Sequence, residues 1–424
     1  MNINKFRHLS ENGENWTEAF RAAVSALERN GGGILEVSAG VYKTGPIRLA
    51  SNMTLDVQAG ARICFIPDRE LYPLIDLEFE GIQGPCRTPC IYARGAENAV
   101  LRGDGVIDGC GEYWWRMVRS KTLDRPRPYL VCFDRCTNVK IQNLTLTNSP
   151  VWTVHPYRCT KVLIEKLNIV NPPDSPNTDG IDPDSCSDVK IIGCTIDVGD
   201  DCIAIKSGTE DTPSRVPCER IIITDCHFLH GHGGIVLGSE MSGGIKNVLV
   251  SSCVFYQTDR GVRLKTRRGR GGTVSGLRLD NCQMEDVMCP FVFNMMYFCG
   301  KGGKLPVVSD PLPQPVCEGT PRLEDVSISG ISIKSCTACA GFFRGLPEMR
   351  IRNVSISDVS IEMKEGAPKK PAMLERCTEM SRQGFYLCET DGVRLTDIRF
   401  ENLNGPAVTQ DTGADCSIQN VSSI

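Results

Sequence analysis

Carboxylates are concentrated in two short stretches of this sequence. One is Asn177-Thr-Asp-Gly-Ile-Asp-Pro-Asp184 and the other is Asp197-Val-Gly-Asp-Asp201. Two carboxylates can hydrolyse a glycosidic bond, one as the acid that protonates the leaving oxygen and one as the base that activates water. Crowding of like charges helps, because it keeps one of the groups protonated near neutral pH. The two stretches therefore predict a hydrolytic site that contains Asp179, Asp200 and Asp201.

Other charged groups follow at comparable intervals. Asp179 and Asp200 are about 21 residues apart, and His232 and then the pair Arg263 and Lys265 come after steps of similar length. If each step is one coil of a stacked fold, these side chains lie on neighbouring rungs of one side. Residues two apart in a strand share a face, so Arg263 and Lys265 point into one groove. An arginine fork beside a lysine point charge suits a substrate carboxylate.

Adjacent Asp200 and Asp201 would normally face opposite sides of a strand. We expect both to serve the site only because Gly199 permits a bend between them and the preceding strand. Other aspartates in this region are interpreted as turn residues whose side chains bind their own backbone. These are Asp182, Asp184, Asp188 and Asp197.

The elements that must position these residues are repeated β-strands. Each repeat is two short alternating strands joined by a polar turn, and the period is about 21 to 32 residues. Helical periodicity is absent from these repeats, which argues against leucine-rich and ankyrin-type folds. An all-β parallel β-helix is predicted, in which each coil stacks on the last. Copies of the repeat begin at residues 138, 161, 188, 219, 246, 276, 323, 350 and 393.

The prediction is a single β-helix domain over residues 1–424, with an N-terminal cap and first strands in about 1–60 and coils in about 100–410. Residues 16–27 form an amphipathic helix that covers the open amino-terminal edge, and Gly31 to Gly33 end it. Two stretches, residues 62–98 and 284–322, interrupt the repeat. The second contains five prolines after residue 305 and is predicted to be a long loop insertion.

Composition excludes several classes of protein. The 424 residues include 47 Lys and Arg against 51 Asp and Glu, a net charge of -4, so neither nucleic acid nor a membrane surface is an expected partner. No run approaches the roughly 18 apolar residues of a membrane span. The amino terminus shows no signal-peptide pattern, so a cytoplasmic location is expected. The 22 cysteines are then expected to be mostly free, buried thiols.

The site residues resemble glycoside hydrolase family 28, the polygalacturonase family. The family motifs stand here in order as Asn177-Thr-Asp179, Gly199-Asp-Asp201, Gly231-His-Gly233 and Arg263-Leu-Lys265, with Leu in place of the usual Ile. Residues 103–115 and 148–155 also look like the family. The likeness covers roughly residues 15–410, and the closest expected type is a bacterial exo-polygalacturonase.

The resemblance implies a right-handed β-helix and hydrolysis of α-1,4-linked galacturonic acid with inversion. Carried over, Asp200 is the general acid, while Asp179 and Asp201 position and deprotonate the water. The resemblance also implies that His232 tunes the acid, and that the remaining residues bind substrate. These are Arg263, Lys265, Asn177, His155 and Trp152. For Trp152 and His155, packing in the core is an equally weighted alternative.

Several alternatives stay open. A β-helix lyase would use calcium and a basic residue, and a non-catalytic glycan-binding module would not need three carboxylates around one water. Within the hydrolases, rhamnogalacturonan or another uronate-bearing glycan is the competing substrate. The partner expected is an acidic oligosaccharide, cut from its end, with the two insertions walling off one end of the groove. No cofactor and no metal are expected.

Two other motifs are interpreted conservatively. Cys226, His227, His230 and His232 resemble a zinc cluster, but His232 already has a role in the hydrolytic site. The run Arg267-Arg-Gly-Arg-Gly-Gly272 looks like an RNA-binding box. We interpret it as a solvated loop that adds positive field for an acidic sugar.

Overall fold

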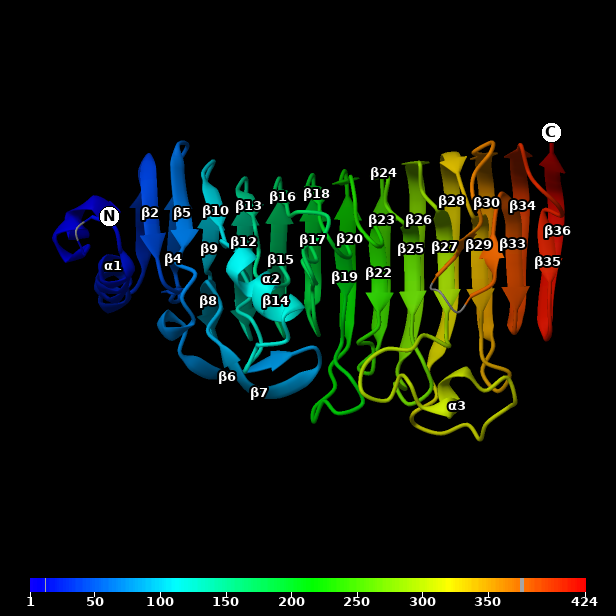
Figure 1. The fold of residues 1–424 in the computed structure, drawn as a ribbon, viewed down its shortest axis with the longest axis horizontal. Coiled ribbons are helices and arrows are strands. Elements are labelled where there is room, and N and C mark those ends of the chain that lie inside the picture. Colours follow the sequence, from blue (N-terminus) through cyan, green and yellow to red (C-terminus); the bar gives the residue numbers. More distant parts are fainter. Residues whose placement is uncertain (12, 374–376) are drawn as a thin grey trace. The chain divides into compact units, whose positions relative to one another are not determined.

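The repeats of the sequence fold into parallel coils in the computed structural model, which describes residues 1–11, 13–373 and 377–424. The chain divides into two compact units, Met1–Asp201 and Cys202–Ile424. In each unit, strands from successive repeats pair in parallel and stack coil upon coil (Figure 1). The predicted right-handed parallel β-helix is confirmed. Whether the two units behave as one domain stays a prediction.

Inward-facing aliphatic columns explain why the repeats stack. The alternating pattern sends every second residue inward, and the register aligns equivalent residues of successive coils. Burial of each such side chain stabilises the fold by about 1.5–3 kcal/mol. Two adjacent columns, at most 2% exposed, are Val139, Val162 and Val189, and Ile141, Ile164 and Ile191.

The unit Met1–Asp201 contains three stacks of parallel strands. The first is β1 (Gly33–Val37), β4 (Met53–Val57), β9 (Val100–Arg102), β12 (Thr137–Gln142), β15 (Thr160–Glu165) and β17 (Ser187–Ile192). The second is β2 (Gly40–Thr44), β5 (Ala61–Phe65), β10 (Val106–Asp108), β13 (Thr145–Thr147), β16 (Asn168–Val170) and β18 (Thr195–Asp197). The third is β3 (Ile47–Arg48), β8 (Ile91–Arg94), β11 (Val131–Asp134) and β14 (Val154–Tyr157).

The described residues of the unit Cys202–Ile424 form two main stacks of parallel strands. One stack is β20 (Cys218–Thr224), β23 (Ile245–Ser251), β26 (Thr273–Glu285), β28 (Arg322–Cys336), β30 (Ile351–Met363), β34 (Thr390–Glu401) and β36 (Ala414–Ser423), with β21 (His227–Phe228) and β24 (Val254–Tyr256) leading into the second half of β26. The other is β19 (Ile203–Ile205), β22 (Ile235–Gly238), β25 (Arg260–Lys265), β27 (Cys289–Asn294), β29 (Cys339–Arg344), β33 (Gln383–Cys388) and β35 (Val408–Gln410). A small antiparallel pair is β31 (Lys370–Pro371) and β32 (Glu379–Met380).

The predicted capping helix is α1 (Thr17–Arg29), which packs against β1, β2 and β3 (Figure 1). Its inward face buries Phe20, Val24 and Leu27, and the left-handed Gly31 follows its carboxyl end. The other helical segments are short. They are η1 (Ile3–Leu9), η2 (Arg69–Leu71), α2 (Glu112–Arg119) and α3 (Pro306–Ser309).

Both predicted interruptions have narrower bounds than the sequence indicated. Residues 62–98 include most of β5 and all of β8, which are coil strands, because their apolar residues continue the stacks. The insertion between them is the antiparallel hairpin of β6 (Leu74–Phe79) and β7 (Ile82–Arg87) (Figure 1). Similarly, β26 extends to Glu285 and β27 to Asn294, so the second loop covers residues 295–321.

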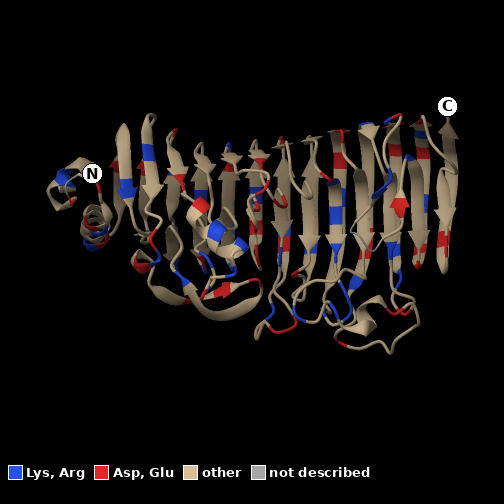
Figure 2. Ribbon diagram, in the orientation of Figure 1, with Lys and Arg blue, Asp and Glu red and all other residues tan. Residues whose placement is uncertain are grey.

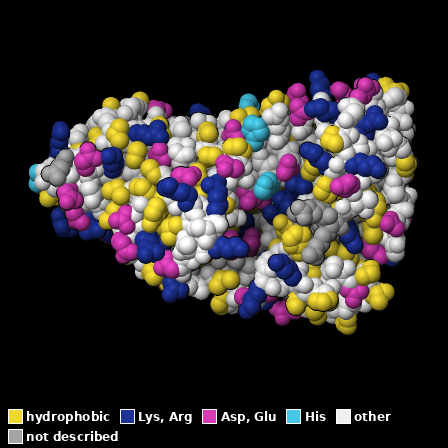
Figure 3. Space-filling view, in the orientation of Figure 1, with side chains coloured by type: hydrophobic (Ala, Val, Ile, Leu, Met, Phe, Trp, Pro, Cys, Tyr) yellow, Lys and Arg dark blue, Asp and Glu magenta, His cyan; other side chains and the backbone are white. Residues whose placement is uncertain are grey.

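The charged side chains and the cysteines are distributed as the composition predicts. Acidic and basic residues are mixed over the coils and are interspersed with apolar side chains on the visible face of each unit (Figures 2 and 3). The 22 cysteines occur as thiols, and most of them are buried, as predicted. Within the described residues, no helix is long and apolar enough to cross a bilayer.

Candidate active site

The turn that carries Asp179 is held by hydrogen bonds from the neighbouring coil. The backbone N–H of Thr153 donates to the Asp179 carbonyl at 2.9 Å, and Gly180 N–H donates to the Asp201 carbonyl at 3.0 Å. Asn177 begins the turn in the left-handed conformation, at φ 54°, which asparagine tolerates. The predicted spacing of one coil between the Asp179 and Asp200 motifs is therefore confirmed.

Gly199 lets the chain approach the preceding coil closely. A Cβ atom there would lie 2.5 Å from the Ser175 carbonyl oxygen and 2.7 Å from that of Pro172. Only glycine fits such a gap. The residue is needed for close approach of two backbones, which differs from the bend that the sequence suggested. Its effect on the site is the expected one, because both following aspartates reach the same place.

Three carboxylates meet at the end of the first unit. One oxygen each from Asp179, Asp200 and Asp201 lies within 4.8 Å of the other two. Asp179 and Asp201 are 4% and 1% exposed, whereas Asp200 is half-buried. The cluster therefore has the components of acid–base catalysis: one accessible group and two sheltered ones that can hold a water molecule.

The second unit carries the predicted histidine and cations. Gly233 accepts a hydrogen bond from Cys202 N–H at 2.8 Å, and Gly234 N–H donates to the Arg260 carbonyl at 2.9 Å. The turn with His232, whose side chain is exposed, thus lies one coil before β25. Gly234 is obligatory there, since a Cβ would lie 2.3 Å from the Phe255 ring.

Arg263 and Lys265 share one face of β25, as their spacing predicts. The Arg263 guanidinium and the Lys265 ammonium lie 5.5 and 5.7 Å from the centre of the Tyr297 ring. Arg263 also donates through Nε to the Met373 sulfur at 3.4 Å. Both cations are mostly buried, which strengthens their attraction for an anion.

The predicted pair Trp152 and His155 is covered by the β6–β7 hairpin. Phe79 of β6 stacks on Trp152 with ring centres 6.0 Å apart, and Tyr129 lies edge-on to His155 at 4.5 Å. Trp152 is 3% exposed and His155 1%. This burial favours the packing interpretation of the pair; contact with substrate stays a prediction.

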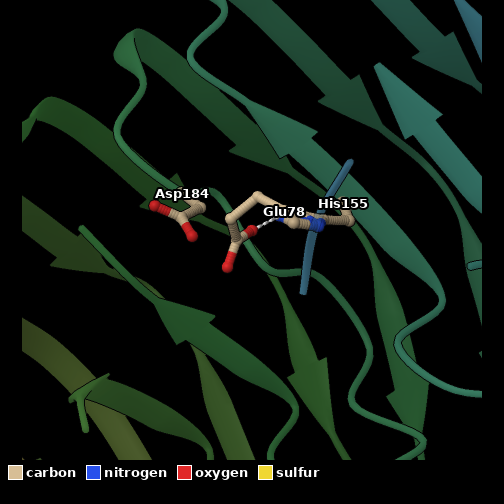
Figure 4. A group of neighbouring side chains, drawn as sticks. All are labelled: Glu78, His155 and Asp184. Atoms are coloured by element: carbon tan, nitrogen blue, oxygen red, sulfur yellow. Dashed lines mark ion pairs between the residues drawn. The ribbon is translucent and has the colours of Figure 1, made fainter. Parts of the chain in front are cut away.

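His155 is also part of a buried polar group (Figure 4). Its Nε2 lies 3.7 Å from Oε2 of Glu78, and ligand atoms of Glu78, His155 and Asp184 lie within 4.8 Å of one another. The sequence predicts Asp184 to be a turn residue; its side chain is fully buried and faces this group. Within the described residues, two groups of side chains have the oxygen and nitrogen donors that could bind a divalent cation: this one, and Asp179, Asp200 and Asp201.

Comparison with known proteins shows the family of this chain. Residues 76–310 match the family model described as glycosyl hydrolases family 28. A probable polygalacturonase of Vitis vinifera is 33% identical over 84% of this chain and 72% of its own length. This chain belongs to glycosyl hydrolase family 28.

Other relatives extend this result. The crystal structure of a hyperthermoactive exopolygalacturonase from Thermotoga maritima is 30% identical, with a TM-score of 0.76 over 93% of this chain and 91% of that one. A polygalacturonase of Chamaecyparis obtusa is 31% identical over 68% of this chain, which spans 52% of its length. Membership in family 28 makes the protein a glycosidase, as the sequence predicted.

The arginine-rich run of this family-28 chain is not the solvated loop that we expected. Arg267 and Arg270 are 2% and 3% exposed and each donates to a carboxylate oxygen of Glu210 at 2.5 Å. Arg268 is 6% exposed and pairs with Glu348 at 2.6 Å. The expectation was wrong for a tertiary reason. The loop of residues 295–321 covers these side chains and supplies carbonyl acceptors, while Glu210 and Glu348 neutralise their charge.

Sequence reasoning missed Glu78, Asp184 and Arg127. Glu78 lies in an insertion without a motif, so no signal identified it. Asp184 stands in the aspartate-rich stretch of residues 177–184, but its sequence context does not distinguish it from a turn residue. Arg127 had a usable signal, because it stands between two prolines directly before the apolar strand β11. Its guanidinium donates to Asn177 Oδ1 at 2.9 Å, which places it beside the turn of Asp179.

Proposed function

We propose that this glycosidase hydrolyses α-1,4-linked galacturonic acid with inversion, removing residues from the end of short galacturonide chains. The observation that carries the proposal is the cluster of Asp179, Asp200 and Asp201, in which one carboxylate is accessible and two are sheltered. The accessible Asp200 is the proton donor to the leaving oxygen. Asp179 and Asp201 hold and deprotonate the attacking water.

Specificity for a uronate is supported by the cations on β25. Arg263 and Lys265 offer a planar fork and a point charge to the same carboxylate, and the Tyr297 ring beside them gives an apolar surface for a sugar. Both cations are mostly buried, which strengthens their attraction for a substrate carboxylate. Substrates related to rhamnogalacturonan remain the alternative within the family.

Exo action is supported by the β6–β7 hairpin. It folds over the outward face of β11 and β14, where Phe79 stacks on Tyr129 and Trp152. An open groove along these strands would bind the middle of a polymer, whereas a covered one admits only a chain end. The Thermotoga maritima relative, named an exopolygalacturonase, points in the same direction.

The separation of the catalytic carboxyl groups bears on the stereochemistry of hydrolysis. Inverting glycosidases generally keep their two carboxyl groups about 6.5–9.5 Å apart and retaining ones about 5–5.5 Å. Here one oxygen each of Asp179, Asp200 and Asp201 lies within 4.8 Å of the others, which is an oxygen-to-oxygen distance and not a separation of whole carboxyl groups. The case for inversion rests on the family resemblance and on the third carboxylate, which allows two groups to share the water. Stereochemistry is therefore the most informative measurement.

One experiment tests both parts of the proposal. A hexagalacturonide is digested in an NMR tube, and the anomer and size of the first products are recorded before mutarotation. Inversion at an α-linkage gives the β-anomer first, and exo action gives monomer from the first turnovers. An initial α-anomer contradicts inversion, and early dimers and trimers contradict exo action. An unsaturated, ultraviolet-absorbing product would instead identify a lyase, and activity only on rhamnogalacturonan would change the substrate.

A further inference from the structure

Arg127 is a buried cation in the loop between α2 and β11. Its side chain joins two successive coils: Nη1 donates to the carbonyls of Pro150 and Pro176, both at 2.8 Å, and Nη2 donates to Asn177 Oδ1 at 2.9 Å. The residue is 5% exposed. One guanidinium thus fixes the start of the segment that leads into β14 and the turn that leads to Asp179.

Three acceptors at these distances make the geometry specific to arginine. A planar guanidinium donates in several fixed directions, whereas a lysine ammonium acts as a point charge. The Asn177 amide oxygen is one of the acceptors, and this residue holds the left-handed backbone of the turn. Movement of Arg127 would therefore be transmitted to the Asp179 carboxylate two residues further on.

The charge of Arg127 also acts on Asp179. Burial lowers the pKa of Arg127 to about 10, and the negative charges of Glu80 and Asp179 oppose this shift. The side chain therefore remains cationic at neutral pH. Attraction between charges is mutual, so the guanidinium also favours the ionised form of the Asp179 carboxylate.

We propose that Arg127 is a positioning residue for hydrolysis, which holds the Asp179 turn in place and keeps its carboxylate ionised as part of the water-activating pair. The inference rests on the proposed hydrolytic function, because it takes Asp179 to be part of the base that deprotonates the attacking water. It does not depend on which glycan is cleaved. Arg127 contacts the turn and need not touch the substrate.

The test compares Arg127→Gln, which keeps hydrogen-bonding groups but loses the charge, with Arg127→Lys, which keeps the charge but loses the fork. For Arg127→Gln, we expect kcat to fall about 10- to 100-fold with KM changed less than about threefold. The acidic limb of the kcat profile should move to higher pH by about 0.5–1 unit, because the base loses a nearby cation. Arg127→Lys should keep the wild-type limb while losing about tenfold in kcat.

Arg87→Gln is the matched control. Arg87 is also a buried arginine, 7% exposed, and it pairs with Asp124 at 2.9 Å and with the Arg69 carbonyl at 2.8 Å. Its replacement should reduce thermal stability without moving the pH profile. Circular dichroism and melting curves are recorded for all variants.

The proposal is overturned if Arg127→Gln keeps the wild-type acidic limb, or loses activity only in proportion to its loss of stability, as the control does. If Arg127→Gln does not fold, Arg127→Lys decides: wild-type kcat would refute the positioning role. Every variant is assayed on the glycan that the wild type cleaves fastest. Failure of the wild type to cleave galacturonides would contradict the proposed function and leave the Arg127 comparison intact.

Discussion

The ion pair of Arg268 and Glu348 should be a main support of the loop that follows β27. Glu348 accepts from Arg268 Nε at 2.6 Å and from Nη2 at 2.8 Å, and both side chains are at most 6% exposed. Arg268 also donates to the carbonyls of Val307 and Asp310, both at 2.7 Å. Replacement of Glu348 by Gln leaves a buried guanidinium without a counter-charge.

Removal of one partner from a buried ion pair typically costs about 3–5 kcal/mol, and we expect Glu348→Gln to lower the free energy of unfolding by this amount. Urea denaturation followed by tryptophan fluorescence and circular dichroism measures it. Limited proteolysis should cut residues 295–321 faster in the variant. The matched control is Glu401→Gln, which breaks the exposed pair with Arg399 and should cost less than about 1 kcal/mol.

The effect should depend on pH in a defined direction. Burial acts to raise the pKa of Glu348, but hydrogen bonds from Arg268 outweigh it and hold the pKa below its ordinary value of 4.5. Such a carboxylate stabilises the fold at pH values above 4.5, and this contribution is lost as pH falls through the lower, folded-state value. The difference between wild type and Glu348→Gln should be constant from about pH 6 to 8 and shrink in acid. A loss no larger than that of Glu401→Gln, or one that grows in acid, would refute the reasoning.

Two further predictions concern single side chains. Asp200→Asn should reduce kcat on the best substrate by about 100-fold or more while the melting curve is unchanged, because the proton donor is lost. The control Asp197→Asn, which changes the last residue of β18, should remain active. Near-full activity of the Asp200 variant would remove Asp200 from the acid role. Cys64 should be alkylated by iodoacetamide faster than Cys416 at pH 7.5, because more of it is thiolate. A hydrogen bond from Cys110, together with Arg62, lowers the pKa of Cys64 to about 7 despite its burial. Burial raises the pKa of Cys416 to about 11. Peptide mass spectrometry of partly labelled protein compares these two half-buried thiols, and equal rates would show that the local environment does not activate Cys64.

Local sequence was sufficient for the coils and for the core of the site. Alternation of apolar residues specifies which side chains point inward, so Val139, Val162 and Val189 could be aligned without a structure. The same periodicity placed Asp179 one coil before the Asp200 motif and put Arg263 and Lys265 on one face of β25. These features depend only on spacing along the chain, which the sequence states directly.

Tertiary structure alone decided what covers the coils. Nothing in the chain near Glu78 indicates that a hairpin brings it to His155 and Asp184, residues that are far away in sequence. Similarly, Arg268 looks like a solvated cation until Glu348 and the loop of residues 295–321 are placed over it. Burial and charge pairing are set by which distant segments meet. A sequence determines the residues that can do chemistry, but the partners that neutralise, orient or cover them are fixed only when the chain has folded.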